Sequence, residues 1–189
     1  MIRLYFAGYS METWLDSRHI FTGRIFSVRT GTVRLDNGLT AYREVVEHPG
    51  GVCVLPWTGH SVILVRQFRI ALGHDIIEAP AGKLEGPDDD PVARGKIELE
   101  EEVGFRAEHM TGAGTIYGTV GFCSEKIHLF VASGLTCVPV RPEPEEVFER
   151  IEWTVETVEE ELRRHTLQDA KTIVLLERFL RLLRENRLP

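Results

Sequence analysis

The chain has 189 residues, of which 43% are hydrophobic and 27% are charged, and its net charge is −7 at pH 7. This length and balance are those of one globular domain with its own core and room for a small appendage. The acidic surplus argues against a nucleic-acid partner, and an acidic protein that handles phosphates needs metal ions to do so. Three widely separated cysteines exclude a disulfide framework and favour a reducing cytoplasm, and no apolar run approaches the roughly 20 residues of a membrane span.

The first half of the chain is predicted to be rich in strands. Residues 20–46 alternate between apolar and polar side chains around Asn37-Gly38, which is a strong signal for a hairpin turn. A second, more apolar hairpin is expected from residues 50–57 and 61–69, which flank the turn residues Thr58-Gly59-His60. A short strand at residues 75–80 then leads into a glycine-containing loop.

The second half is predicted to alternate helix, strands and helices. Asp90 is suited to cap a helix, Pro91 to begin it and Gly104 to end it. Three strands are expected next, over residues 112–118, 126–132 and 149–155. Two helices close the chain: the first has Thr157 and Glu160 in capping-box spacing, and the second spans about residues 169–186. On the second helix, apolar residues recur at helical spacing at Ile173, Leu176, Phe179, Leu180 and Leu183. This order predicts a mixed sheet between helices, in an α/β or α+β fold.

The segment IELEEEVGF, residues 97–105, concentrates four carboxylates in five positions. On a helix, Glu98 and Glu102 lie on one flank of the apolar face, with Glu101 a little further round, so their spacing lets the carboxylates converge. Glu100 points elsewhere, one turn beyond Lys96, and is expected to form an ordinary surface ion pair. Three oxygen ligands beside a packed face suit Mg²⁺ or Mn²⁺, although a solvated acidic face explains such a run by itself at least as well.

The surrounding residues resemble a known family. AGKLEGPDDDPVARGKIELEEEVGF, residues 81–105, is similar to the Nudix box, a glycine, a loop and a helix that ends in Arg-Glu-apolar-x-Glu-Glu-x-Gly-apolar. Gly82 opens the box, and its closing half is matched by Glu98, Leu99, Glu101, Glu102, Gly104 and Phe105. Segments such as REVVEHPGGVCVLP, EAPAGKLE, GFCSEKIHLFVASGL and QDAKT extend the resemblance, over most of residues 20–175, to the ADP-ribose pyrophosphatase branch.

The chain departs from the family pattern in two places. Its loop is one residue longer, with Asp88 or Asp89 where a glutamate is usual. Ile97 stands where the box has an arginine that pairs with a neighbouring box glutamate, so Glu101 loses that partner. Lys96 and Arg94 do not lie at the same helical angle. These changes bear on efficiency more than on identity.

The resemblance implies a Nudix α/β/α sandwich with a mixed sheet over residues 46–189. An N-terminal antiparallel β-sheet precedes it, over residues 1–45, and in relatives this sheet pairs with a second subunit. A homodimer is therefore expected. The implied reaction is the metal-dependent hydrolysis of ADP-ribose, or a related ADP-sugar, to AMP and a sugar phosphate, with Mg²⁺ as cofactor and Mn²⁺ as a possible substitute.

The resemblance also implies roles for individual residues. Glu98, Glu102 and the backbone carbonyl of Ala81 are the expected main metal ligands, with Glu101 and Glu149 as additional ones. The residues assigned to the substrate are Arg43, Arg69, Glu78 and Gly82. A base is expected from the loop VRPEPEEVFERIEW, where we assign Glu146, with Glu145 as its nearest rival.

Each of these roles has a simpler alternative. On this simpler interpretation, Arg43 and Arg69 are ordinary surface residues on strands, and Glu78 is a carboxylate at the end of a strand. The loop that carries Glu145 and Glu146 is then an acidic surface segment interrupted by prolines. Two other functions also stay open. In the first, the substrate is a different nucleoside diphosphate derivative, such as another nucleotide sugar or a dinucleotide. In the second, the chain is a catalytically weak ADP-ribose-binding module, which Ile97 would favour.

Overall fold

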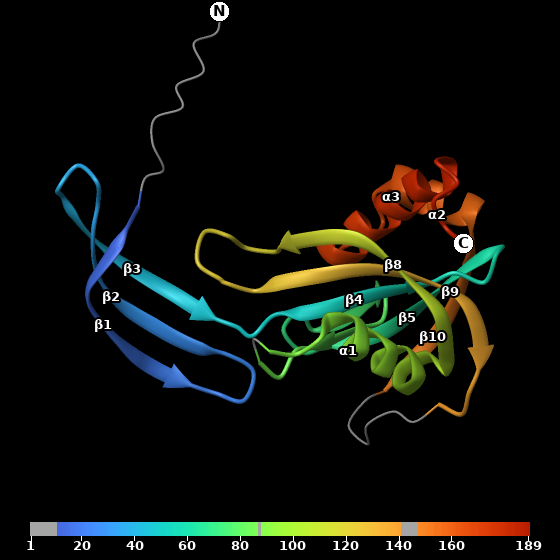
Figure 1. The fold of residues 1–189 in the computed structure, drawn as a ribbon, viewed down its shortest axis with the longest axis horizontal. Helices are drawn as coiled ribbons and strands as arrows, with labels where there is room; N and C mark the ends of the chain where they lie inside the picture. The colour runs from blue at the N-terminus through green and yellow to red at the C-terminus, as the bar shows by residue number, and fades with distance from the viewer. Residues whose placement is uncertain (1–10, 87, 141–146) are drawn as a thin grey trace, which may run out of the picture. The chain divides into compact units, whose positions relative to one another are not determined.

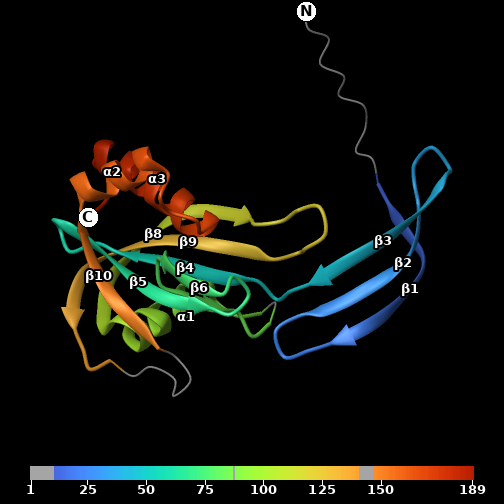
Figure 2. The same ribbon diagram turned by 180° about the vertical axis from the view of Figure 1, so that it is seen from behind.

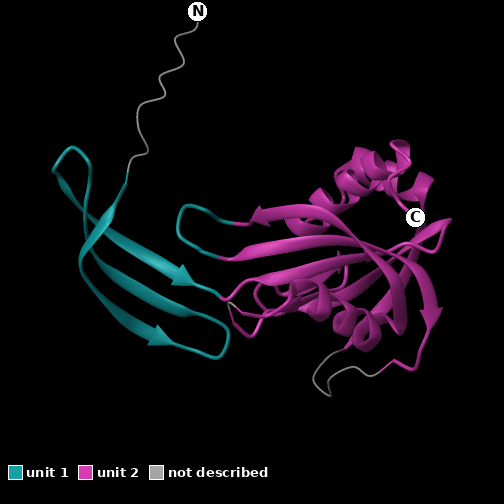
Figure 3. Ribbon diagram, viewed as in Figure 1, with its two compact units in different colours: residues 1–48, 119–124 teal, residues 49–118, 125–189 magenta. Residues whose placement is uncertain are grey.

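The computed structural model describes residues 11–86, 88–140 and 147–189, and it divides into two compact units (Figures 1 and 3). Unit 1 consists of residues 1–48 and 119–124, and unit 2 of residues 49–118 and 125–189. The boundary predicted from the sequence, between residues 45 and 46, stays a prediction. No helix in the described part of the chain is long and apolar enough to cross a membrane.

Unit 1 is a three-stranded antiparallel sheet in the order β1-β2-β3. Its strands are β1 (Thr13–Thr22), β2 (Ser27–Arg34) and β3 (Thr40–Glu47). The predicted hairpin at Asn37-Gly38 is confirmed, since Gly38 takes the left-handed conformation with φ 82°. Residues 119–124 join this unit through two main-chain bonds: Val46 N–H donates to Phe122 O at 2.7 Å, and Ser124 N–H donates to Val46 O at 2.9 Å.

Unit 2 contains two sheets. The first has the order β7-β4-β9-β8, and its central pair β4 and β9 is parallel while the outer pairs are antiparallel. Its strands are β4 (Gly51–Pro56), β7 (Ala81–Lys83), β8 (Phe105–Tyr117) and β9 (Lys126–Cys137). The second sheet is antiparallel, with the order β10-β5-β6, and consists of β5 (Ser61–Arg69), β6 (His74–Glu78) and β10 (Phe148–Thr154).

The helices begin and end largely where local signals place them. α1 (Pro91–Glu98) starts with the Asp90 side chain accepting from Val92 N–H, and it continues as a π-helical turn, η1 (Leu99–Val103), that ends at left-handed Gly104. α3 (Ala170–Arg184) matches the predicted last helix. The expected capping box was wrong, because α2 (Val155–Arg164) begins three residues earlier and its cap is Thr154.

The sheets of unit 2 lie between helices, with α1 on one side and α2 and α3 on the other (Figures 1 and 2). Alternate residues of β4 point to opposite sides. Leu55 packs with α3 residues such as Phe179, whereas Val54 packs with Leu99 and Val103 of η1. The α/β/α sandwich predicted from the sequence is therefore confirmed. The helical spacing in α3 is confirmed at Leu176, Phe179 and Leu180, which are buried.

The second predicted hairpin was wrong in its pairing. β4 and β5 do follow each other around the turn at residues 58–60, but they belong to different sheets and share only the isolated bridge between Trp57 and Val62. Both edges of β4 are already occupied by β7 and β9, and both edges of β5 by β6 and β10. β8 also begins seven residues before the predicted strand at 112–118, and β10 begins at Phe148, so Glu149 lies within a strand.

Candidate active site

Two box glutamates are buried at the end of α1. Glu98 is 4% exposed and Glu102 is 8% exposed, although carboxylates rarely occupy such positions without a partner. Gly82 on β7 makes room for the first of them, because a Cβ at this position would lie 1.7 Å from Glu98 Oε1. The second lies close to the neighbouring residue, since Ala81 N–H donates to Glu102 Oε2 at 3.3 Å. The structure therefore brings Ala81, Gly82, Glu98 and Glu102 together, four of the residues singled out from the sequence.

The backbone of Ala81 faces the acidic turn and not the sheet. On either side of it the chain bonds to β4: Val54 N–H donates to Pro80 O at 2.8 Å, and Leu84 N–H donates to Gly50 O at 3.0 Å. Because hydrogen-bonded positions alternate along an antiparallel pair, the N–H and C=O of Ala81 point away from β4. β7 is an edge strand, so these groups point toward η1, where the N–H already meets Glu102.

The expected convergence of Glu98, Glu101 and Glu102 on one metal ion stays a prediction. Among the described residues, no three His, Cys, Asp or Glu side chains come together closely enough to hold a metal ion. The physical reason lies in the backbone, which widens into a π-helical turn from Leu99, so that residues after Glu98 no longer follow the α-helical spacing. Glu101 is less buried than the other two carboxylates.

Two carboxylates of this acidic segment contact arginine side chains. Arg94 lies one turn before Glu98 and contacts it, with 2.7 Å between Arg94 Nε and Glu98 Oε1. Glu100 forms a surface ion pair, as expected, with 2.8 Å between Arg106 Nε and Glu100 Oε1. Ile97 is exposed and lines a shallow cavity with Lys96, Glu100 and Glu101.

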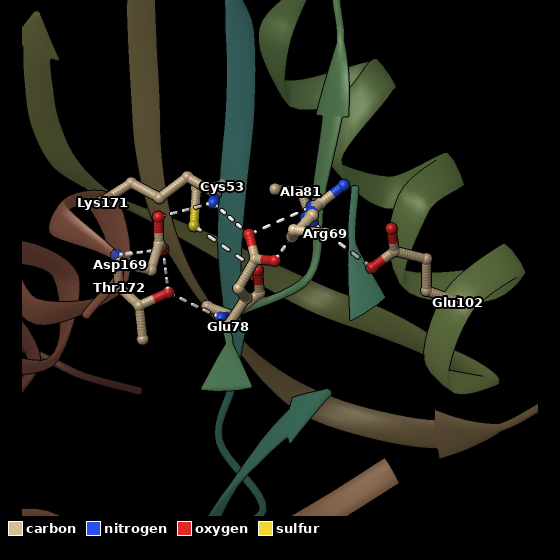
Figure 4. Close-up of polar contacts among 9 residues, drawn as sticks. Cys53, Arg69, Glu78, Ala81, Glu102, Asp169, Lys171 and Thr172 are labelled. Atoms are coloured by element: carbon tan, nitrogen blue, oxygen red, sulfur yellow. Dashed lines mark hydrogen bonds and ion pairs between the residues drawn. The ribbon is translucent and has the colours of Figure 1, made fainter. Parts of the chain in front are cut away.

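A second group of charged residues surrounds Glu78 at the end of β6 (Figure 4). Arg69 of β5 binds the Glu78 carboxylate with both ends of its guanidinium, through Nε to Oε1 at 2.6 Å and Nη2 to Oε2 at 3.0 Å. Lys171 Nζ of α3 donates to Glu78 Oε2 and also to Asp169 Oδ1, the latter at 2.9 Å. Glu78 itself is only 2% exposed, so its charge is held by two cations inside the fold.

The same group fastens α3 to the segment between β6 and β7. Asp169 caps α3 by accepting from Thr172 N–H at 3.0 Å and from the Thr172 hydroxyl at 2.5 Å. The oxygen of that hydroxyl accepts from Ala79 N–H at 2.8 Å. The sulfur of buried Cys53 lies 3.8 Å from the carbonyl oxygen of Ala79. Hydrogen bonds thus connect the start of α3 to the residues that lead into Ala81.

These contacts shift the ionisation of the buried groups. Burial alone would raise the pKa of Glu78, but the hydrogen bonds from Arg69 and the charge of Lys171 outweigh it and lower the pKa below its usual range. Burial would lower the pKa of Lys171, and the neighbouring Asp169 and Glu78 charges instead raise it. Burial raises the pKa of the Cys53 thiol, which makes a nucleophilic role unfavourable. All three groups therefore stay in one protonation state at neutral pH.

Sequence reasoning missed Lys171, Asp169 and Thr172. It selected Arg69 and Glu78 separately, and the structure joins them to each other. The segment QDAKT contributed to the family resemblance, but nothing local assigned a partner to its lysine, because Lys171 and Glu78 are 93 residues apart in the chain. A carboxylate with both an arginine and a lysine can be recognised only after the fold is known.

The remaining predicted site residues lie elsewhere. Arg43 belongs to unit 1, on β3, where it pairs with Glu12 at 2.6 Å. Glu149 is exposed on β10 and pairs with Arg66 at 3.0 Å. Glu145 and Glu146, the two candidate bases, lie outside the described residues.

The oxygen donors at Ala81, Glu98 and Glu102 fit a hard divalent cation. Mg²⁺ is commonly held by one or two carboxylates together with water and substrate phosphates, and it does not need a cage made only of protein ligands. The two buried carboxylates and the Ala81 carbonyl, which points away from β4, provide such a partial set. Gly82 supports this fit, because its missing side chain leaves the space that the Glu98 carboxylate occupies.

Curated proteins similar to this chain cover most of its length. An ADP-ribose pyrophosphatase of Bacillus subtilis is 35% identical over 169 residues, which cover 88% of this chain and 91% of that protein. A methanol dehydrogenase activator of Bacillus methanolicus is 34% identical over the same lengths. A GDP-mannose pyrophosphatase of Cronobacter sakazakii is 33% identical over 147 residues, 71% of this chain and 75% of that protein.

The fold is shared with a solved structure described as an ADP compounds hydrolase. Its TM-score is 0.81 with 20% sequence identity, and the match covers 94% of this chain and 97% of that one. The chain matches no protein-family model.

Proposed function

Because the chain belongs to the Nudix hydrolase family, we infer that it is a pyrophosphohydrolase that cleaves the pyrophosphate bond of ADP-ribose or a related ADP-sugar. The products are AMP and a sugar phosphate. One observation carries the proposal: the two box glutamates, Glu98 and Glu102, are buried against Ala81 and Gly82 in a chain that is 35% identical to an ADP-ribose pyrophosphatase.

We propose that Glu98, Glu102 and the carbonyl of Ala81 hold Mg²⁺, for which Mn²⁺ can substitute. Glu101 is a further candidate ligand from the same turn. Once bound, the metal neutralises phosphate charge and lowers the pKa of a bound water. The carboxylates supply the negative charge that attracts the cation, and this explains how a protein of net charge −7 accepts an anionic substrate.

The substrate side of the site is assigned to arginines. Cleavage of a phosphoanhydride depends mainly on positioning and on neutralising charge, and a guanidinium matches two phosphate oxygens well. Arg69 and Arg43 take this role in the proposal, and Gly82 is placed beside them because it leaves room for the Glu98 carboxylate. The family resemblance also assigns Glu78 to the substrate. Its carboxylate is already engaged by Arg69 and Lys171, and this favours a role through Arg69.

The attacking water needs a base that the metal does not occupy. We assign this role to Glu146, with Glu145 as the alternative, both in the segment that precedes β10. Glu149 is a candidate for an additional metal contact, although its ion pair with Arg66 would have to open first. A base should affect turnover much more than KM when it is replaced by glutamine.

The test begins with a hydrolysis screen of ADP-ribose, nucleotide sugars and dinucleotides with Mg²⁺ and with Mn²⁺. Glu102→Gln should reduce turnover by about two orders of magnitude or more, because a bound metal supplies several kcal/mol of transition-state stabilisation. Glu100→Gln is the matched control, since Glu100 pairs with Arg106 on the surface, and it should keep its turnover. Wild-type turnover in a folded Glu102→Gln variant would contradict the assignment.

Two other functions have an observation in their favour. The likeness to a GDP-mannose pyrophosphatase supports another nucleotide sugar as the substrate, and the relative rates in the screen distinguish it. Ile97, in place of the box arginine, favours a weak ADP-ribose-binding module. Calorimetric binding of ADP-ribose without release of AMP would identify that case.

We also propose a homodimer formed through the N-terminal sheet, residues 1–45, with the hydrolase domain over residues 46–189. Apolar side chains are exposed along this sheet, at Leu15, Ile20, Phe21, Ile25, Phe26 and Tyr42. Such a set on a three-stranded sheet favours a protein partner. The three free cysteines suit a reducing cytoplasm, which is the compartment that we expect.

A further inference from the structure

The charged group around Glu78 is not explained by the binding of metal or by the supply of a base. It contains two cations, Arg69 and Lys171, and two anions, Glu78 and Asp169, so its formal charges cancel. Three of these side chains are largely buried, whereas 42% of the Arg69 side chain is exposed. Burying an ion-pair network adds little to stability compared with apolar residues of the same volume. A role in the site accounts better for its presence.

The network leaves part of Arg69 available. Nε and Nη2 are both bonded to Glu78, and within the described part of the chain Nη1 has no hydrogen-bond partner. The guanidinium lies on the side of Glu78 that faces Ala81 and Glu102 (Figure 4), and the charge of Glu102 acts on it. An arginine held by two bonds in one plane presents its remaining N–H groups in a fixed direction.

Lys171 determines where the Glu78 carboxylate sits. Without Lys171, Arg69 would be the one cationic partner of Glu78. The carboxylate and the guanidinium could then change orientation together, because the arginine is partly exposed. With Lys171 present, Glu78 Oε2 is held from the opposite side by a lysine that is itself bound to Asp169, the cap of α3. The rigid end of a helix therefore fixes the orientation of an arginine on β5, the strand paired with the one that carries Glu78.

We propose that Lys171 is a positioning residue for substrate binding, which acts through Glu78 to hold the Arg69 guanidinium toward the pyrophosphate of the substrate. Asp169 supports it by fixing the ammonium group. The inference rests on the proposed function, since it takes Arg69 to contact the substrate phosphates.

The first experiment measures kcat and KM for ADP-ribose with Mg²⁺ in Lys171→Met. An arginine that binds the phosphates equally in the ground and transition states affects KM and leaves kcat nearly unchanged. We expect KM to rise about 10- to 100-fold, the range typical when the outer partner of a site residue is removed. Lys171→Arg keeps the charge and should restore most of the affinity. If Lys171→Met does not fold, Lys171→Gln, which can still donate a hydrogen bond to Glu78, replaces it.

Two controls separate positioning from loss of stability. Lys126→Met removes an exposed lysine that forms no ion pair with the described residues. Phe179→Leu weakens the packing of α3 in the core without touching the charged group. Neither should change KM. If Phe179→Leu raises KM as much as Lys171→Met does, the charged group is merely structural and the proposal is overturned.

The decisive comparison is the double variant Lys171→Met/Glu78→Gln. Because Lys171 acts through Glu78, its replacement should raise KM no further once the carboxylate is gone. Effects that multiply would show that Lys171 acts by another route and would overturn the proposal. So would a KM for Lys171→Met within about twofold of wild type, where the expected change is at least tenfold.

A measurement without turnover separates this inference from the proposed function. Amide hydrogen exchange at Ala79, whose N–H is bonded to Thr172 Oγ1, should become faster in Lys171→Met relative to the core amides of β9, and should not in Phe179→Leu. If wild-type protein neither binds nor hydrolyses ADP-ribose, the proposed function fails while this exchange still reports on the network. Unchanged exchange at Ala79 would overturn the positioning role even in an active enzyme.

Discussion

Among the described glycines, Gly82 leaves the least room for a side chain. A Cβ at this position would lie 1.7 Å from Oε1 and 2.1 Å from Cδ of Glu98. The obstacle is the end of a side chain and not the backbone, so a larger residue here would move the carboxylate before it disturbed the strand. The glycine that opens the box thus has a direct physical link to a carboxylate 16 residues later in the helix.

Gly82→Ala is therefore expected to separate folding from metal use. The free energy of unfolding should change by no more than about 1 kcal/mol, the size of the backbone effect of the exchange. The Mg²⁺ concentration for half-maximal activity should rise about tenfold or more, since Glu98 is displaced. A Mg²⁺ titration of activity and a urea unfolding curve measure the two quantities.

Gly86→Ala is the matched control, because a Cβ at Gly86 meets no atom within 4 Å. It lies four residues further along, after the end of β7, and should leave the Mg²⁺ titration unchanged. A folded Gly82→Ala variant with wild-type Mg²⁺ dependence would show that Glu98 does not need its present position.

The elements that could be predicted are those specified by neighbouring residues. Asp90 caps α1, the fixed φ of Pro91 suits its first position, and Gly104 ends η1 in the left-handed conformation. Each of these effects acts within a few residues, so the sequence predicts them. The turn at Asn37-Gly38 is local in the same sense. Glu98 and Glu102, the proposed metal ligands, could be singled out in the same way, since they lie on one short segment.

The elements that could not be predicted depend on competition between distant segments. β4 did not pair with β5 because β9, about 75 residues later, forms a parallel ladder with it that no nearby sequence announces. The π-helical turn at Leu99–Val103 changed the spacing on which the three-carboxylate cluster was based. The attachment of α3 to β6 through Lys171 likewise required the fold itself.

The contact between α3 and β6 should make stability depend on pH. The folded protein lowers the pKa of Glu78 from its usual 4.5, so the unfolded chain takes up the proton first as the pH falls. The stability that Glu78 contributes is present above pH 4.5 and is lost as the pH falls toward the lowered value. Melting temperatures measured across the acid range should decline less steeply for Glu78→Gln than for wild type.

Other carboxylates with lowered pKa values, such as Glu47, contribute to the acid slope of both proteins, so the difference between the two curves isolates Glu78. Glu100→Gln is a suitable reference for the loss of an exposed ion pair, which is worth at most about 1 kcal/mol. Parallel curves for wild type and Glu78→Gln would mean that the network does not hold the carboxylate charged.

At the scale of the whole molecule, the two units differ in how well they bury their side chains. The core of unit 2 is closed by helices on both sides of its sheets, whereas nearly every residue of β1 in unit 1 is exposed. A three-stranded sheet is stable only when other residues pack against its apolar face. The proposed dimer would cover it.

We predict that the wild-type protein is a dimer by light scattering coupled to gel filtration. Ile20→Lys should shift it toward monomer, because a charge on the exposed face of β1 would be buried in the interface. Leu39→Lys, on an equally exposed apolar residue at the turn between β2 and β3, is the control. A fully active wild-type monomer would contradict the proposal.

The loop between β8 and β9 has a consequence for the order in which the protein is made. Val46 exchanges main-chain hydrogen bonds with Phe122 and Ser124, so the end of β3 is completed by residues that leave the ribosome more than 70 positions later. The N-terminal sheet emerges first but cannot finish folding until most of the hydrolase core has been synthesised. A fragment cut after residue 48 would lack that closing segment, so truncations that aim to isolate the sheet should include residues 119–124 as a separate peptide.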